Sequence, residues 1–393
     1  MDNDYRLYGT NQKQGQDYNK SVVFEHIRLY GPISRTEIST RTLLVPQTVS
    51  NLVKVLIDDG LVQERTGSVQ KGRRGAIPTN LVVREDARFA LGIQVQYSRI
   101  VGALIDLNGN ILKRCEISGN RDNAVQMKRD LSRIIDSLIS ESAVAANLLG
   151  IGLGVPMFEN FRTDTVGGYP SFPFRSQVEL REELEHRYSY PIIIGNNAQM
   201  AAVGEYWMGR GRVPRTFLYV YLGEYVGGGM ILDGDSYAGV SGRAVELGHT
   251  QYMPDGRQCY CGMRGCLDQY GSANAIKQSL DLHRDVSLES VVQMSRNGNT
   301  GARRALNDGV MALSDGMVNA LMLFDAPACI VGGPNANMLF ALLQPYLTYK
   351  ISARGLAVEV LKSEIDIYAG AIGAASTVFH EALWCKPSTL LKM

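Results

Sequence analysis

Four side chains that suit a soft metal ion fall close together in the second half of the chain. They are one histidine and three cysteines within residues 249–266, and glycines at 262 and 265 let the loop between them bend. Thiolates and imidazole are the ligands of closed tetrahedral zinc sites. The spacing therefore predicts a structural zinc site made of His249, Cys259, Cys261 and Cys266. The alternative is a group of unrelated buried thiols beside a surface histidine.

The segment around these ligands resembles that of a known family. Residues 246–249 read ELGH and residues 259–268 read CYCGMRGCLD. This pattern resembles the zinc segment of the ROK family (repressors, open reading frames and sugar kinases), and within it the sugar-responsive repressors. The resemblance implies an α/β fold in which residues 89–393 form a two-lobed, actin-like sugar-kinase domain. Lobe one would span about 89–194 plus the C-terminal helix, and lobe two about 195–370.

Length and composition are compatible with this organisation. A chain of 393 residues with 45% hydrophobic residues favours two or three well-packed domains. The net charge is +1, so a nucleic-acid partner would need a local basic patch. No stretch resembles a signal peptide or a membrane span, and the remaining cysteines are scattered. We therefore expect a cytoplasmic protein without membrane insertion.

The first 83 residues predict a flexible arm (1–18) and a winged helix-turn-helix domain (19–83). Helical spacing of apolar residues begins at Asn19 and stops before Gly31-Pro32. Ser34 and Glu37 form a capping box for a second helix, and Pro46 suits the first turn of a third. Two short segments, 61–64 and 80–83, on either side of a polar loop then predict the strands of the wing.

The third helix is the expected DNA-reading element. Glutamine and asparagine pair with adenine edges in the major groove, and arginines on a wing suit phosphates or a narrow minor groove. This domain also resembles that of ROK repressors, and ROK sugar kinases lack it. The alternative is a helical dimerisation module with a solvated loop. The predicted DNA contacts are Gln47, Thr48, Ser50, Asn51, Arg73 and Arg74.

After a short linker, strands and helices alternate. The pattern predicts a hairpin (89–96 and 100–106), a strand (111–116), one amphipathic helix (123–144) and a buried strand (149–155). A last helix over 370–382 is rich in small residues, which allow close packing.

Three positions argue against phosphoryl transfer. The resemblance places an acidic residue where this chain has Gln94, and a small residue where it has Glu224. It also places the catalytic carboxylate where the chain has Asn197. An amide has no useful basicity and cannot act as a general base, although it can hydrogen-bond a hydroxyl. We therefore predict a binding cleft and no enzyme.

The resemblance also assigns the sugar-binding groups. The alternatives are a helix cap for the two asparagines and solvated surface positions for the two acids. For the histidine, one ring nitrogen would bind the metal and the other would face a ligand hydroxyl or Glu246. The predicted ligand-binding residues are Asn196, Asn197, Glu246, His249 and Asp268.

Three functions are weighed on these grounds. The first is a repressor of carbohydrate-utilisation genes, a homodimer or homotetramer that binds double-stranded operator DNA and is modulated by a sugar or sugar derivative. The second is an ATP-dependent sugar kinase with a regulatory DNA-binding domain. The third is a regulator controlled by a protein partner.

Overall fold

The computed structural model describes most of the chain. The described residues are 12–66, 79–96, 98–119, 123–156, 158–160, 165–167, 177–209, 214–283, 286–365 and 367–384. The predicted wing residues Arg73 and Arg74 lie outside these ranges, so their placement stays a prediction.

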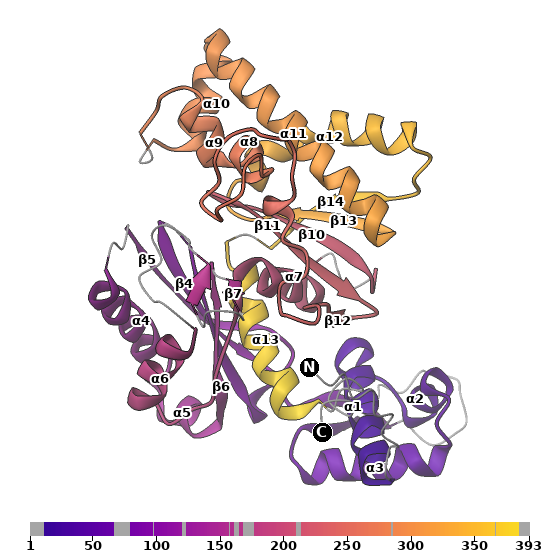
Figure 1. Ribbon diagram of the computed structural model, residues 1–393. Coiled ribbons are helices and arrows are strands. Elements are labelled where there is room, and N and C mark those ends of the chain that lie inside the picture. Colours follow the sequence, from indigo (N-terminus) through magenta and orange to yellow (C-terminus); the bar gives the residue numbers. More distant parts are fainter. Residues whose placement is uncertain are drawn as a thin grey trace, which may run out of the picture.

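Three helices and a two-stranded antiparallel sheet form the N-terminal domain (Figure 1). Ser34 and Glu37 form the expected capping box, and Pro46 occupies the first turn of α3. The first helix begins at Gln12, inside the expected arm, because lysine and glutamine favour helix even where nothing apolar is buried. The elements are α1 (Gln12–Tyr30), α2 (Arg35–Thr42), α3 (Pro46–Asp58), β1 (Val62–Thr66) and β2 (Thr79–Val83).

The core of this domain continues into the rest of the molecule. Phe24 and Ile27 of α1 pack with Leu52 and Leu56 of α3, and the same cluster extends to Trp207 and Phe379. The connection after the domain is one short 3-10 turn, η1 (Glu85–Ala87). The N-terminal domain therefore shares a hydrophobic core with the domain that follows.

The first lobe is a five-stranded mixed sheet with strand order β5-β4-β3-β6-β9. β3, β4 and β5 form an antiparallel meander, whereas β6 and β9 run parallel to β3. The lobe's elements are β3 (Phe89–Val95), β4 (Arg99–Asp106), β5 (Ile111–Ser118), α4 (Ala124–Leu138), α5 (Ser142–Asn147), β6 (Leu148–Val155), β7 (Phe158–Asn160), β8 (Thr165–Gly167), α6 (Gln177–Arg187) and β9 (Ile192–Asn196).

The single helix expected over 123–144 was wrong, since it is two helices with a break between them. α4 ends at Leu138, and α5 starts at Ser142. At the break, the hydroxyl of Ser140 donates to the carbonyl oxygen of Ser137. Serine side chains compete in this way with helical backbone hydrogen bonds, which an apolar periodicity does not record.

The second lobe is another five-stranded sheet, with strand order β12-β11-β10-β13-β14, and helices α8 to α12 lie on its outer side (Figure 1). Its elements are α7 (Asn197–Met208), β10 (Phe217–Leu222), β11 (Val226–Leu232), β12 (Asp235–Ser236), η3 (Leu247–His249), α8 (Asp268–Gly271), α9 (Ala273–Gln278), α10 (Leu288–Arg296), α11 (Thr300–Phe324), β13 (Ala328–Gly332), α12 (Ala336–Ala353) and β14 (Glu359–Lys362). The two-lobed α/β architecture expected from the sequence is confirmed.

The last helix, α13 (Ala369–Leu383), returns to the first lobe and packs along α7 (Figure 1). The two backbones touch: a Cβ on Gly373 would collide with the carbonyl oxygen of Met200, and one on Gly204 with that of Ala369. Only glycine allows this approach. No helix in the described part of the chain is long and apolar enough to cross a membrane.

Candidate functional site: a metal cluster beside a polar cleft

The four predicted metal ligands come together. The ligand atoms of His249, Cys259, Cys261 and Cys266 all lie within 4.8 Å of one another. The Cys261 and Cys266 sulfurs are 3.6 Å apart, and so are the Cys259 sulfur and His249 Nδ1. Sulfurs bound to one tetrahedral metal at about 2.3 Å are separated by about 3.8 Å, so the donor set and its spacing fit a tetrahedral ion.

Backbone geometry holds the cysteine loop in this shape. The Cys259 N–H donates to the Met263 carbonyl oxygen at 2.8 Å, and the Gly265 N–H donates to that of Arg257 at 2.8 Å. Gly265 has φ +77°, and a Cβ there would collide with the backbone of Met253. Glycine at this position is therefore required for the loop to close.

Burial perturbs the protonation of the cluster. It raises the pKa of the Cys259 and Cys266 thiols and lowers the pKa of His249 to about 4. Without a metal, these groups are neutral at pH 7. A metal ion would displace the thiol protons, because it binds thiolate.

His249 joins the cluster to a cleft between the lobes. Its Nδ1 faces Cys259, and its Nε2 lies 3.2 Å from the hydroxyl oxygen of Tyr260. As predicted, one ring nitrogen faces the metal cluster and the other faces away from it. The second nitrogen contacts Tyr260, whereas the prediction named a ligand hydroxyl or Glu246. We did not predict Tyr260 from the sequence, because a tyrosine between two metal-binding cysteines carries no signal of its own.

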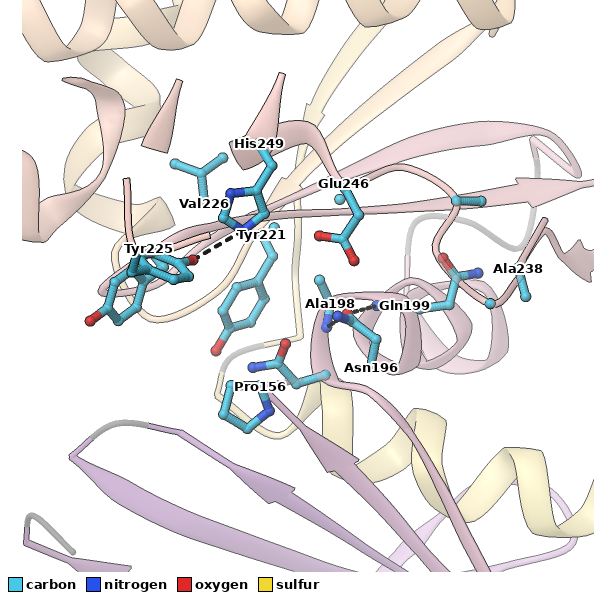
Figure 2. Close-up of a pocket in the computed structure, with 16 residues that line it drawn as sticks. Pro156, Asn196, Ala198, Gln199, Tyr221, Tyr225, Val226, Ala238, Glu246 and His249 are labelled. Atoms are coloured by element: carbon cyan, nitrogen blue, oxygen red, sulfur yellow. Dashed lines mark hydrogen bonds between the residues drawn. The ribbon is translucent and has the colours of Figure 1, made fainter. Parts of the chain in front are cut away.

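The cleft collects side chains from both lobes and from the metal segment (Figure 2). Pro156 follows the first lobe's β6, the asparagines and Gln199 belong to the start of α7, and two tyrosines flank the β10–β11 turn. The lining residues are Pro156, Asn196, Asn197, Ala198, Gln199, Tyr221, Tyr225, Val226, Gly227, Gly228, Ala238, Gly242, Ala244, Glu246, His249 and Tyr260.

Four of the five predicted ligand-binding residues line this cleft, and each contributes differently. Asn196 caps α7: its side-chain oxygen accepts from the N–H groups of Ala198 at 2.9 Å and Gln199 at 3.2 Å. The cap that we weighed as an alternative for Asn196 is therefore present. Asn197 is the first residue of the helix and also lines the cleft.

The fifth residue, Asp268, is not among the lining residues. Its side chain lies behind the cleft wall, where the residue is 1% exposed and accepts from the Val226 N–H at 2.7 Å. Burial raises its pKa to about 7, against the lowering effect of that hydrogen bond. Asp268 thus supports the β10–β11 turn that forms one wall of the cleft.

Among the described residues that line the cleft, Glu246 carries the one carboxyl group. Burial raises its pKa to about 7, and Arg243 lowers it by a smaller amount. Close to neutral pH, both the carboxylate and the carboxylic acid are populated. The group can therefore accept a hydrogen bond from a ligand hydroxyl or donate one to it.

The positions where the sequence departs from a kinase are filled by internal contacts. The Gln94 amide is buried and donates to the Tyr221 hydroxyl at 3.3 Å. Glu224 pairs with Lys277 at 2.7 Å, and the Lys277 side chain is only 2% exposed. Arg99, at the start of β4, pairs with Glu116 on β5 at 3.2 Å.

The predicted DNA-reading residues gather at the start of α3. Gln47 and Asn51 are exposed one turn apart, and the Gln47 amide donates to the Asn51 side-chain oxygen at 3.0 Å. Thr48 and Ser50 are half-buried beside them. Valine at 49 is buried and anchors the helix to the domain core.

Comparison with known proteins defines the class. The model of the ROK family matches residues 90–381. The chain therefore belongs to the ROK family, as its metal segment indicated.

Individual relatives show which members of the ROK family the chain is similar to. The chain is 28% identical over 373 residues to the xylose repressor of Bacillus subtilis, covering 93% of this chain and 96% of the relative. It is 28% identical over 275 residues to the DNA-binding transcriptional repressor Mlc of Escherichia coli, covering 70% and 68%. Glucokinase of Streptomyces coelicolor is 26% identical over 309 residues, covering 72% of this chain and 96% of the enzyme.

A solved structure described as a ROK family transcriptional regulator, a homologue of the E. coli Mlc protein, superimposes with a TM-score of 0.75. It covers 97% of this chain and 98% of its own, at 22% identity. The likeness therefore extends over the N-terminal domain as well as the two lobes, and it establishes the fold.

Proposed function

We propose that this protein is a DNA-binding transcriptional repressor of carbohydrate-utilisation genes whose operator affinity is set by a sugar or sugar derivative in the cleft. A relative named as a xylose repressor matches 93% of the chain, and the fold of a solved ROK family transcriptional regulator covers 97% of it, N-terminal domain included. In this proposal the exposed start of α3 reads the major groove. The cleft supplies amide, carboxyl and tyrosine groups that bind hydroxyls.

The observation that carries the proposal is the position of Asn197. This residue lines the cleft, and its side chain is an amide at the position where the family's kinases need a basic carboxylate. Glu224 strengthens it, because its side chain and its ion pair with Lys277 occupy the β10–β11 turn, where a small residue is expected in a kinase. We therefore propose binding without phosphoryl transfer. The kinase alternative would regain support from sugar-dependent ATP turnover by the purified protein.

The cluster of one histidine and three cysteines is proposed to hold zinc in a structural role. Four protein ligands leave no open coordination position, and zinc is the common ion for this ligand set. When bound, the ion would hold η3 and the cysteine loop together. His249, and with it the cleft wall, would then keep a fixed orientation.

The test is a DNA-binding titration with and without sugars. A fluorescent DNA fragment from the region upstream of the gene for this chain would serve as the operator. It would be titrated with protein at two salt concentrations, in parallel with a scrambled fragment. We expect preferential operator binding that changes when an effector sugar is added. Equal affinity for both fragments at moderate salt would remove the repressor proposal.

We expect a cytoplasmic homodimer or homotetramer, since two half-sites need two α3 helices.

A further inference from the structure

The cysteine loop also places an aromatic side chain in the cleft. Tyr260 lies between Cys259 and Cys261, and its side chain lines the cleft. Its ring meets that of His249 edge-on, with centroids 5.1 Å apart, and that of Tyr225 at 5.3 Å. Residues from η3, the β10–β11 turn and the metal loop thus form one aromatic wall.

The histidine lines the cleft itself and also contacts this tyrosine. When a metal occupies Nδ1 of His249, its Nε2 carries the hydrogen and must donate. The Tyr260 oxygen, 3.2 Å away, is then the acceptor. A phenol that accepts a hydrogen bond still has its own O–H to donate, and cooperative polarisation makes that donor stronger.

We propose that Tyr260 is a specificity-determining residue: it donates a hydrogen bond to the effector, and the effector is an uncharged polyhydroxy compound. This inference rests on the proposed sugar-responsive function and extends it. With a metal bound, His249 would polarise the Tyr260 hydroxyl, and Tyr225, whose ring meets that of Tyr260 edge-on, would border the same ligand.

The charges around the cleft favour a neutral ligand over a phosphorylated one. Among the described residues that line it, there is one carboxyl group, Glu246, and no lysine or arginine. A phosphate ester needs cationic or multiple N–H donors. Lys277 is buried in its pair with Glu224, and Arg243, adjacent to the lining residues in sequence, acts on Glu246.

The test compares Tyr260→Phe with a matched control, Tyr252→Phe. Tyr252 follows the same η3 segment and its ring lies tilted against that of Tyr270, with centroids 5.2 Å apart, but it does not line the cleft. Metal content per chain and the melting temperature would be measured for both variants and wild type. The ligands are a panel of neutral pentoses, hexoses and N-acetylhexosamines with their phosphate esters.

We expect wild type and Tyr252→Phe to be stabilised by a neutral sugar and not by phosphate esters. Tyr260→Phe should keep its metal but bind that sugar about tenfold more weakly, as expected for one lost hydrogen bond. Unchanged affinity in Tyr260→Phe, or stabilisation of wild type by phosphate esters alone, would overturn the inference while leaving sugar sensing intact. Wild type that responds to no compound would instead remove the sugar part of the proposed function.

Monodeoxy analogues of the bound sugar give a second measurement that does not depend on how the variant folds. One analogue should bind wild type about tenfold more weakly and show no further loss in Tyr260→Phe. If every monodeoxy analogue bound wild type as tightly as the parent sugar, the proposed hydrogen bond from Tyr260 would be contradicted.

Discussion

The guanidinium carbon of Arg28 lies 3.9 Å from the centre of the Trp207 ring. Arg28 belongs to α1 of the N-terminal domain, and Trp207 is near the end of α7, whose first residues line the cleft. Glu25 pairs with the same arginine at 2.7 Å. A single helix therefore connects the proposed effector site to the proposed reading domain.

Replacing Arg28 by methionine should weaken this connection. The variant loses a cation–π contact and an ion pair whose arginine side chain is fully buried, so we expect the free energy of unfolding to fall by roughly 2–4 kcal/mol. Sugar binding should stay close to wild type, whereas the effect of sugar on operator affinity should shrink. Thermal unfolding and DNA titration measure the two effects. Lys128→Met, which breaks an exposed pair with Glu183, is the control and should change stability by less than about 1 kcal/mol.

Replacing Cys261 by serine should lower the metal content. A hydroxyl is a poor zinc ligand, and the remaining three ligands cannot complete the tetrahedron. We expect less zinc per chain by elemental analysis, and weaker binding of both sugar and operator. Cys115→Ser removes a thiol outside the cluster and should leave the zinc content, sugar binding and operator binding unchanged. Full zinc occupancy in Cys261→Ser would show that this thiol is not a ligand.

The Glu246→Gln variant should reveal a pH-dependent cost of burying the acid. The pKa is about 7 in the folded chain and near 4.5 when unfolded, so the folded state binds more protons between these values. The contribution of Glu246 to the free energy of unfolding is therefore most favourable below pH 4.5. That contribution is lost as the pH rises through about 7. Relative to wild type, the glutamine variant should gain roughly 1–3 kcal/mol between pH 5 and pH 8. Denaturant unfolding of both proteins at pH 5 and pH 8 measures this gain. If wild type and variant differed in their free energy of unfolding by the same amount at both pH values, the raised pKa would be contradicted.

Replacing Asn51 by alanine should weaken operator binding by ~1–3 kcal/mol if this side chain reads a base. Its neighbour Gln47 loses an amide contact in the same variant, so both groups at the exposed face are affected. Binding to scrambled DNA should not change. An equal loss on both DNAs would assign Asn51 to the phosphate backbone.

Features set by local chemistry were predictable from the sequence. The Ser34–Glu37 capping box depends on a spacing of three residues, and the metal cluster depends on ligand types that rarely gather without an ion. Contacts between distant segments were not predictable. Tyr260 reaches His249, and Asp268 turns toward Val226, only because the cysteine loop folds back against the β10–β11 turn.

The glycine contacts between α7 and α13 have a mechanical consequence. With backbone atoms touching at Gly204 and Gly373, neither helix can slide past the other without a collision. We therefore expect α7 and α13 to move together as one rigid unit. Trp384, directly after α13, and Phe24 of α1 have ring centroids 5.0 Å apart, so this unit is also in contact with the N-terminal domain.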